Sequence, residues 1–168
     1  MKRSVTFLIA ILAVVVCVPA FAAARSANLN VTAQVNANCR ITTVDVAFGI
    51  YDPIITNNVA PLDNTGSVTV TCTKGAAGVW VGLDLGTYPA AAVRNMANGA
   101  NRLSYELYSD AGRTAVWGNT ALTGATVTFA AGAGLADPTT LTVYGRVPGG
   151  QDVATGAYAD VVQATVNY

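Results

Sequence analysis

Two cysteines carry the clearest chemistry in this sequence. Cys39 and Cys72 remain once an N-terminal segment that contains Cys17 is set aside. In an exported chain, an even pair of cysteines predicts a disulfide, here worth roughly 3–4 kcal/mol of stability on the chain-entropy estimate. A zinc site is not expected, because two thiols without any histidine do not make up the usual four ligands. We therefore predict a disulfide between Cys39 and Cys72.

Catalytic groups are scarce in the rest of the sequence. Histidine, the commonest general base, is absent, and both cysteines are expected to be oxidised. A Ser–Lys dyad would need Lys74, which precedes a glycine and is typical of an exposed turn. Paired carboxylates are the one catalytic arrangement that the sequence leaves open, although Asp52-Pro53 and Asp63-Asn64 are typical turn sequences. The sequence predicts a protein that is not an enzyme and that needs no cofactor or metal.

Residues 1–22 have the three parts of a secretory signal peptide. Lys2-Arg3 precedes an apolar stretch from Val5 to Val18, and Ala20-Phe21-Ala22 fits the small-residue cleavage pattern. We predict cleavage after Ala22, with cleavage after Ala24 as the alternative. An uncleaved membrane anchor is less favoured, because a membrane-spanning helix needs ~20 apolar residues. The sequence therefore predicts export.

Composition limits what the mature protein can bind. Removing residues 1–22 from the 168-residue chain leaves 146 residues, a typical size for one domain. Seven of the nine basic residues and all nine acidic residues remain, which gives a net charge of −2. No basic surface for nucleic acid is expected. A surface with so few charges suits a structural protein that packs against itself.

Short strands separated by turn residues are predicted throughout the mature sequence. They are rich in valine, threonine and tyrosine, with glycine and proline between them. Ala90–Asn98 is expected to form a short helical turn at most. The pattern predicts an all-β, antiparallel β-sandwich. The predicted strands are Leu29–Val35, Cys39–Phe48, Ser67–Thr73, Val79–Leu85, Leu103–Ser109, Ala125–Ala130, Thr140–Val147 and Asp160–Tyr168.

Three of these strands have informative alternation. Apolar and polar residues alternate in Leu29–Val35 and again in Asp160–Tyr168, which is typical of half-buried strands. A strand at the end of the sequence can leave an unpaired edge, which an early strand could fill in its own chain or in another copy. Within Cys39–Phe48 the apolar residues change phase, so a bulge or kink is expected near Thr42-Thr43. Such a strand could pass from one sheet of a sandwich to the other.

Seven short motifs resemble those of the spore coat protein U domain family. They occur in the family's order from about Ala27 to Tyr168, and together they are far more specific than any one of them. The motifs are Phe48–Pro53, Val68–Gly75, Arg94–Met96, Leu103–Asp110, Trp117-Gly118, Tyr144–Pro148 and Gly156–Asp160.

That family is similar to the pilins of archaic, Csu-type chaperone–usher pili. The resemblance implies an immunoglobulin-like sandwich that lacks its last strand and is completed by a donated N-terminal strand. In such pilins a periplasmic chaperone supplies the strand first, and the N-terminal extension of the next subunit then replaces it. The implied partners are copies of itself or related pilins, a periplasmic chaperone and an outer-membrane usher. The implied location is a cell-surface pilus or extracellular coat, reached through the periplasm.

The sequence and the resemblance together assign three segments. Residues 1–22 are the signal peptide, 23–36 the donor-strand segment and 37–168 the β-sandwich domain. The expected donor residues are Leu29, Val31, Ala33 and Val35. The expected acceptor groove is lined by Val162, Ala164, Val166 and Tyr168, together with residues of Cys39–Phe48.

The leading hypothesis is a structural pilin subunit that polymerises by donor-strand exchange into a fibre for adhesion and biofilm formation. The first alternative is a secreted or spore coat protein that is completed by its own N-terminal strand. The second alternative is a carbohydrate-binding or enzymatic sandwich. A sugar-binding face would be favoured by aromatic residues clustered at strand spacing, and the sequence shows no such cluster.

Overall fold

The computed structural model describes residues 22–120, 124–130 and 132–168. The predicted signal peptide therefore lies outside the described residues, except for Ala22. None of the residues described forms a helix that is long and apolar enough to span a membrane. Residues 1–34 and residues 35–168 are separate units, and each is considered by itself.

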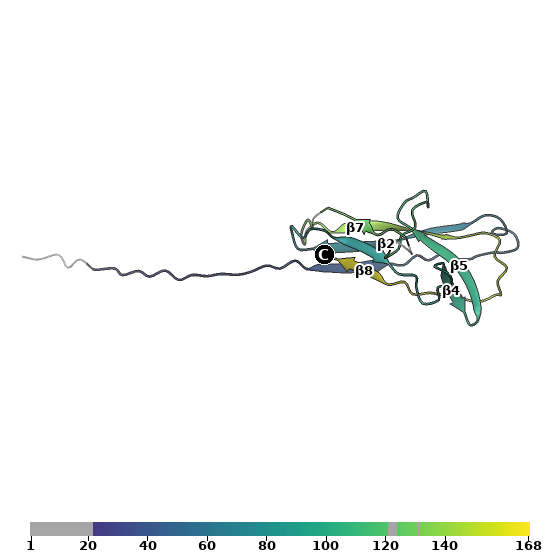
Figure 1. Cartoon of the computed structure of the whole chain (residues 1–168), viewed down its shortest axis with the longest axis horizontal. Helices are drawn as coiled ribbons and strands as arrows, with labels where there is room; N and C mark the ends of the chain where they lie inside the picture. The colour runs from purple at the N-terminus through teal and green to yellow at the C-terminus, as the bar shows by residue number, and fades with distance from the viewer. Residues whose placement is uncertain (1–21, 121–123, 131) are drawn as a thin grey trace, which may run out of the picture. The chain divides into compact units, whose positions relative to one another are not determined.

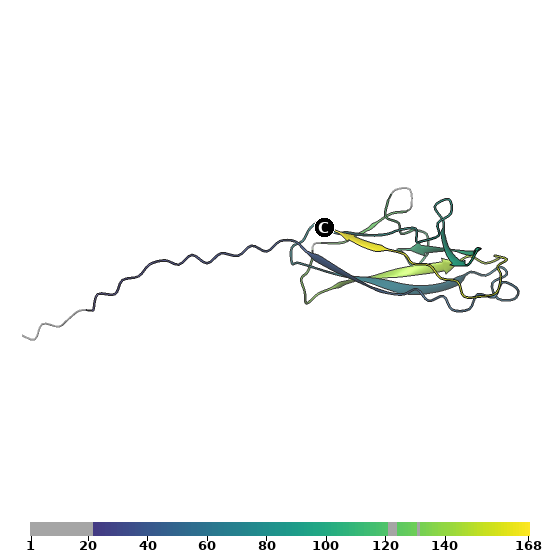
Figure 2. The same ribbon diagram turned by 90° about the horizontal axis from the view of Figure 1, so that it is seen from below.

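The domain consists of strands arranged in two sheets (Figure 1). One sheet has the order β1-β2-β7-β5-β4 and the other has the order β6-β3-β8, and all the paired strands are antiparallel. Figure 2 shows β8 in one layer and β2 and β7 in the other. The strands are β1 (Cys39–Val44), β2 (Leu62–Cys72), β3 (Trp80–Leu83), β4 (Arg94–Asn98), β5 (Asn101–Tyr108), β6 (Val127–Thr128), β7 (Thr139–Val147) and β8 (Ala164–Asn167).

The core lies between the sheets and follows the strand alternation that the sequence shows. Every second residue is buried from Val68 to Cys72 in β2, from Leu103 to Leu107 in β5 and from Val143 to Val147 in β7, because successive side chains of a strand point to opposite faces. Trp117 is fully buried, and its indole Nε1 donates a hydrogen bond to the Val81 carbonyl oxygen at 3.0 Å. The buried strand residues include Val68, Val70, Cys72, Val81, Leu83, Leu103, Tyr105, Leu107, Val143 and Val147.

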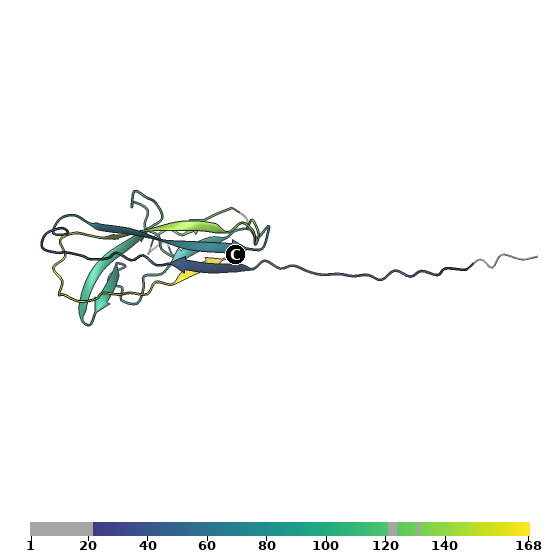
Figure 3. The same ribbon diagram turned by 180° about the vertical axis from the view of Figure 1, so that it is seen from behind.

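A disulfide joins Cys39 of β1 to Cys72 of β2. The two cysteines are register partners in the antiparallel pair, with their Cα atoms 4.0 Å apart. The bond therefore fastens the first residue of β1 to the last residue of β2. Figure 3 shows β1 in dark blue beside β8 in yellow, and residues of these two strands are in contact.

One sequence prediction is wrong: Ala90–Asn98 contains a strand rather than a helical turn. Ala91 and Ala92 have φ angles of 46° and 64°, which lie in the left-handed region and form a turn. The chain then enters β4, which pairs with β5 from Arg94↔Tyr105 to Asn98↔Asn101. Sequence periodicity did not reveal β4, because its buried side chains include the polar residues Arg94 and Asn95.

Arg94 is fully buried and connects β4 to three other parts of the domain. Its Nη1 forms an ion pair with Glu106 of β5. Its Nε donates to the Asp84 carbonyl oxygen at 2.8 Å, and its Nη2 donates to those of Leu83 and Trp117 at 3.0 and 2.8 Å. All three guanidinium nitrogens therefore have partners, as a charge in a dry interior requires.

Two further expectations concern the segments Leu29–Val35 and Cys39–Phe48. No strand is assigned to Leu29–Val35, and Leu29, Val31 and Val35 expose 87%, 86% and 81% of their surface. The expected change of phase in Cys39–Phe48 is present, but it follows Val44 instead of lying near Thr42-Thr43. Register with β2 is unbroken from Cys39 to Val44, and the inward phase resumes at Val46.

Candidate functional site

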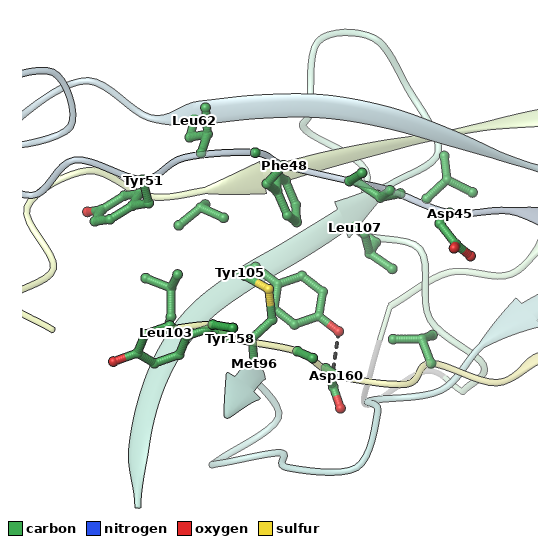
Figure 4. Close-up of a pocket in the computed structure, with 18 of the residues that line it drawn as sticks. Asp45, Phe48, Tyr51, Leu62, Met96, Leu103, Tyr105, Leu107, Tyr158 and Asp160 are labelled. Atoms are coloured by element: carbon green, nitrogen blue, oxygen red, sulfur yellow. Dashed lines mark hydrogen bonds between the residues drawn. The ribbon is translucent and has the colours of Figure 1, made fainter. Parts of the chain in front are cut away.

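An apolar groove of about 780 Å³ runs along the domain between two extended chain segments (Figure 4). One segment, Thr43–Tyr51, continues from β1, and the other, Val153–Val162, leads into β8. The floor comes from the core faces of both sheets. It includes Val68, Leu83, Met96, Leu103, Tyr105, Leu107, Val143 and Val147.

The segment that leads into β8 has the features of a strand with one unpaired edge. Side chains are half-buried at Tyr158, Asp160 and Val162, and exposed at the residues between them. Ala159 exchanges backbone hydrogen bonds of 2.9 and 3.2 Å with Ala97 of β4. Because backbone polar groups alternate sides along an extended strand, those of Tyr158, Asp160 and Val162 point toward the groove. Within the described part of the chain, these groups have no backbone hydrogen-bond partner.

The opposite wall, Thr43–Tyr51, also has backbone groups that face the groove without a backbone partner in the described ranges. Val46 and Phe48 pack against the core, while the carbonyl of Ala47, between them, accepts a hydrogen bond from Asn64 of β2. The backbone groups of Val46 and Phe48 therefore face the groove, and they have no backbone partner among the residues described. Two extended segments with unpaired backbone groups and apolar space between them form a site for an additional extended strand.

A polar contact joins the floor of the groove to the wall that leads into β8. The Tyr105 hydroxyl donates to Asp160 Oδ2 at 2.7 Å, and Asp160 Oδ1 accepts from the backbone N–H groups of Thr87 and Val161, each at 2.8 Å. Gly86 has a φ of +76°, and a Cβ there would clash with Asp160 Oδ2. This position therefore requires glycine, both for its backbone conformation and for space. The Asp160 carboxylate is fully engaged, which leaves an apolar surface for an incoming strand.

Replacing Tyr105 with phenylalanine is expected to make folding less sensitive to alkaline pH. Burial first, and then the hydrogen bond to Asp160, raise the pKa of the Tyr105 hydroxyl above its ordinary value of 10.0. The unfolded chain loses this proton as pH rises through 10, while the folded protein keeps it. Stability from this group is therefore present below that pH and lost above it.

Urea unfolding of the wild type and Tyr105→Phe, at neutral pH and above pH 10, measures this difference. The variant should lose less stability between the two conditions. An equal loss in both proteins would contradict the assignment.

The structure brings only part of the predicted acceptor set to the groove. Val162 and Ala164 line it, whereas Val166 and Tyr168 are not among the lining residues. Val166 lies opposite Val81 in the β3–β8 pair, and the Tyr168 hydroxyl is 3.2 Å from Asn38 Oδ1. At this end of the domain β1 and β8 lie beside each other, and the groove opens only where the chain segments separate beyond them.

Several groove residues were missed by sequence reasoning, which had no means of bringing distant strands together. They include Tyr51, Met96, Leu103, Tyr105, Leu107 and Tyr158. A usable signal was nevertheless present, because two of the family-like motifs, Phe48–Pro53 and Gly156–Asp160, supply opposite walls. Among the residues that the structure describes, no group of three or more His, Cys, Asp or Glu side chains could hold a metal ion.

The chain is similar to known proteins over nearly its whole length. Residues 25–165 match the Spore Coat Protein U domain model. The chain is 40% identical to Protein U of Myxococcus xanthus over 181 aligned positions, which cover 99% of this chain and 98% of that protein.

A solved structure has a similar fold. It is a chain in the crystal structure of the CsuC–CsuE chaperone–tip adhesion subunit pre-assembly complex, from the archaic chaperone–usher Csu pili of Acinetobacter baumannii. The TM-score is 0.52 at 21% identity, and the match covers 80% of this chain but only 40% of that one. On the family match and the full-length relative, this chain belongs to the spore coat protein U domain family.

Proposed function

We propose that this protein is a pilin-like structural subunit that polymerises by donor-strand exchange into an exported surface fibre. The observation that carries this proposal is the apolar groove between two extended segments with unpaired backbone groups. It is the space that a missing strand of an immunoglobulin-like sandwich would fill. The exposed segment Leu29–Val35 has the complementary property, because apolar residues occupy every second position.

The proposed donor and the groove agree in length. The donor side chains from Leu29 to Val35 span six residue steps, or ~20 Å of extended chain. The inward-facing residues of the groove wall, from Tyr158 to Ala164, also span six steps. An antiparallel donor would place Leu29 opposite Ala164 and Val35 opposite Tyr158.

The direction of the donor follows from the two walls. The chain runs in opposite directions along Thr43–Tyr51 and Val153–Val162, so a donor can be antiparallel to only one of them. The wall Tyr158–Ala164 offers the longer run of inward side chains, and antiparallel pairing is the more stable kind. The donor therefore enters near Ala164 and leaves near Tyr158. Successive subunits are then joined head to tail, which generates an open fibre.

Chain length favours donation between subunits over self-completion. Only Asn36–Asn38 separate Val35 from Cys39, the first residue of β1. A hairpin turned at these residues would place Val35 beside Cys39 and Leu29 only beside Asp45. The groove, however, extends from Thr43 to Tyr51, so a strand from the same chain would leave most of it open.

The remaining parts of the proposal come from the family and the fold. A periplasmic chaperone would protect the groove before assembly, an outer-membrane usher would export the fibre, and the fibre would serve adhesion and biofilm formation. The similarity to a chain of a chaperone–subunit complex supports the chaperone. The second candidate is a self-completed coat protein, which the family's description as a spore coat domain favours.

Denaturing gels of the exported protein test the proposal directly. We expect unboiled samples to give a ladder of multimers that collapses to monomer on boiling. A chain without residues 23–35 should keep its groove and bind a chaperone but should form no ladder. A single monomer band for the full-length protein in both lanes would refute strand exchange and favour the self-completed coat protein.

A further inference from the structure

An apolar loop projects from the end of the domain opposite the disulfide. It spans residues 50–60 and joins the first groove wall to β2. Ile54 and Ile55 each expose 76% of their surface, and Ile50 and Val59 expose 88% and 83%. Isolated exposed apolar residues are common, but four in one short loop mark an interaction surface.

This loop is held in shape by polar groups. Asp52 Oδ1 accepts hydrogen bonds from the backbone N–H groups of Ile54 and Ile55 at 2.9 and 3.1 Å. Asn57 is 2% exposed, accepts from the Asp52 backbone N–H at 3.0 Å and donates to the Ala60 carbonyl at 3.0 Å. The Tyr51 hydroxyl donates to the Pro148 carbonyl at 3.0 Å and so ties the loop to the end of β7. The isoleucines are therefore presented on a fixed frame.

The loop lies where the donor strand of the next subunit would leave the groove. Tyr51 and Pro53 of the loop line this end of the groove, together with Val153 and Tyr158. Four residue steps from Val35 to Cys39 span at most ~14 Å. The first strand of the next domain must therefore begin close to the loop.

The end of the domain that contains Cys39 has a shallow depression of about 280 Å³. The disulfide forms part of its lining, and Leu135, which is 84% exposed, stands at its edge. The lining residues are Asn38, Cys39, Arg40, Thr71, Cys72, Thr73 and Leu135.

We propose that Ile54 and Ile55 of one subunit pack against this depression, beside Leu135, on the next copy of the chain. This inference rests on the proposed strand exchange, because the donor linker brings the two surfaces together. The contact is heterologous, since the loop and the depression lie at opposite ends of one domain, and it can repeat along a fibre. It would limit bending at the short linker between domains.

Cysteine cross-linking in assembled fibres tests this contact. The Ile54→Cys/Leu135→Cys variant is oxidised mildly after assembly, then boiled without reductant. We expect its ladder to survive boiling and to collapse when reductant is added. The matched control, Ile54→Cys/Ala111→Cys, moves the second thiol to an exposed turn after β5 and should give a ladder that collapses on boiling.

The outcomes separate this contact from strand exchange. If both variants form ladders but both collapse on boiling, strand exchange stands and the proposed contact is wrong. If wild-type protein forms no ladder, strand exchange itself fails and the contact fails with it. A further experiment compares the adsorption of wild-type and Ile54→Ser/Ile55→Ser fibres to polystyrene, to test whether the loop binds apolar surfaces. If these substitutions reduce adsorption and no cross-link forms, the loop serves apolar surfaces instead of a second copy.

Discussion

Replacing Val31 with aspartate is expected to abolish the boiling-sensitive multimers. Donor residues Leu29, Val31, Ala33 and Val35 together contribute very roughly 5–10 kcal/mol by burial in the groove, at ~1.5–3 kcal/mol for each large aliphatic side chain. A carboxylate at position 31 would be buried among apolar side chains without a cationic partner, which costs several kcal/mol. The ladder on unboiled gels should therefore disappear.

The matched control is Thr32→Asp, which introduces the same charge at the neighbouring, outward-facing position. This variant should polymerise like the wild type. Because Val31 is 86% exposed within its own chain, Val31→Asp should leave the melting temperature of the monomeric domain unchanged. A normal ladder from Val31→Asp would contradict the donor assignment, and loss of the ladder in both variants would point to a general effect of charge.

Replacing Arg94 with methionine is expected to produce the largest loss of stability in the domain. The substitution leaves the Glu106 carboxylate without its cationic partner and leaves the Leu83, Asp84 and Trp117 carbonyls without their donor. Removing one member of a buried ion pair costs roughly 3–5 kcal/mol. For a domain of this size, that loss lowers the melting temperature by roughly 10–20 °C. Thermal unfolding followed by circular dichroism measures the effect.

Arg102→Met is the control, because Arg102 lies on the neighbouring strand but is exposed. Its guanidinium carbon is 4.9 Å from the centre of the Tyr88 ring, a contact worth ~0.5–1 kcal/mol at an exposed site. The melting temperature should therefore change only slightly. Comparable shifts in the two variants would show that the buried network around Arg94 is not a major source of stability.

The comparison of β2, β5 and β4 shows how far sequence alone could predict the fold. The sequence shows valines at every second position in part of β2, and Leu103, Tyr105 and Leu107 alternate in β5; these side chains are buried in the structure. β4 was not predicted because one of its buried positions holds Arg94. Arginine is usually exposed, so its burial could be expected only once its hydrogen-bond partners were known. Those partners lie on β3, β5 and the segment around Trp117, which only folding brings together.

Some features of the candidate site were likewise predictable from the sequence, and others depend on the tertiary structure. The sequence by itself determined the cysteine pair, because only two cysteines remain outside the predicted signal peptide. It also determined the alternation in Leu29–Val35 and the extended character of the groove walls up to Phe48 and from Asp160, because alternation depends on neighbouring residues. Only the tertiary structure decided where the groove opens. Sequence alternation treated Val162 to Tyr168 as one acceptor edge, but β1 lies against β8, and of these residues only Val162 and Ala164 line the groove. Alternation specifies which face of a strand is buried, whereas the edge that remains unpaired depends on how β1 and β8 approach each other.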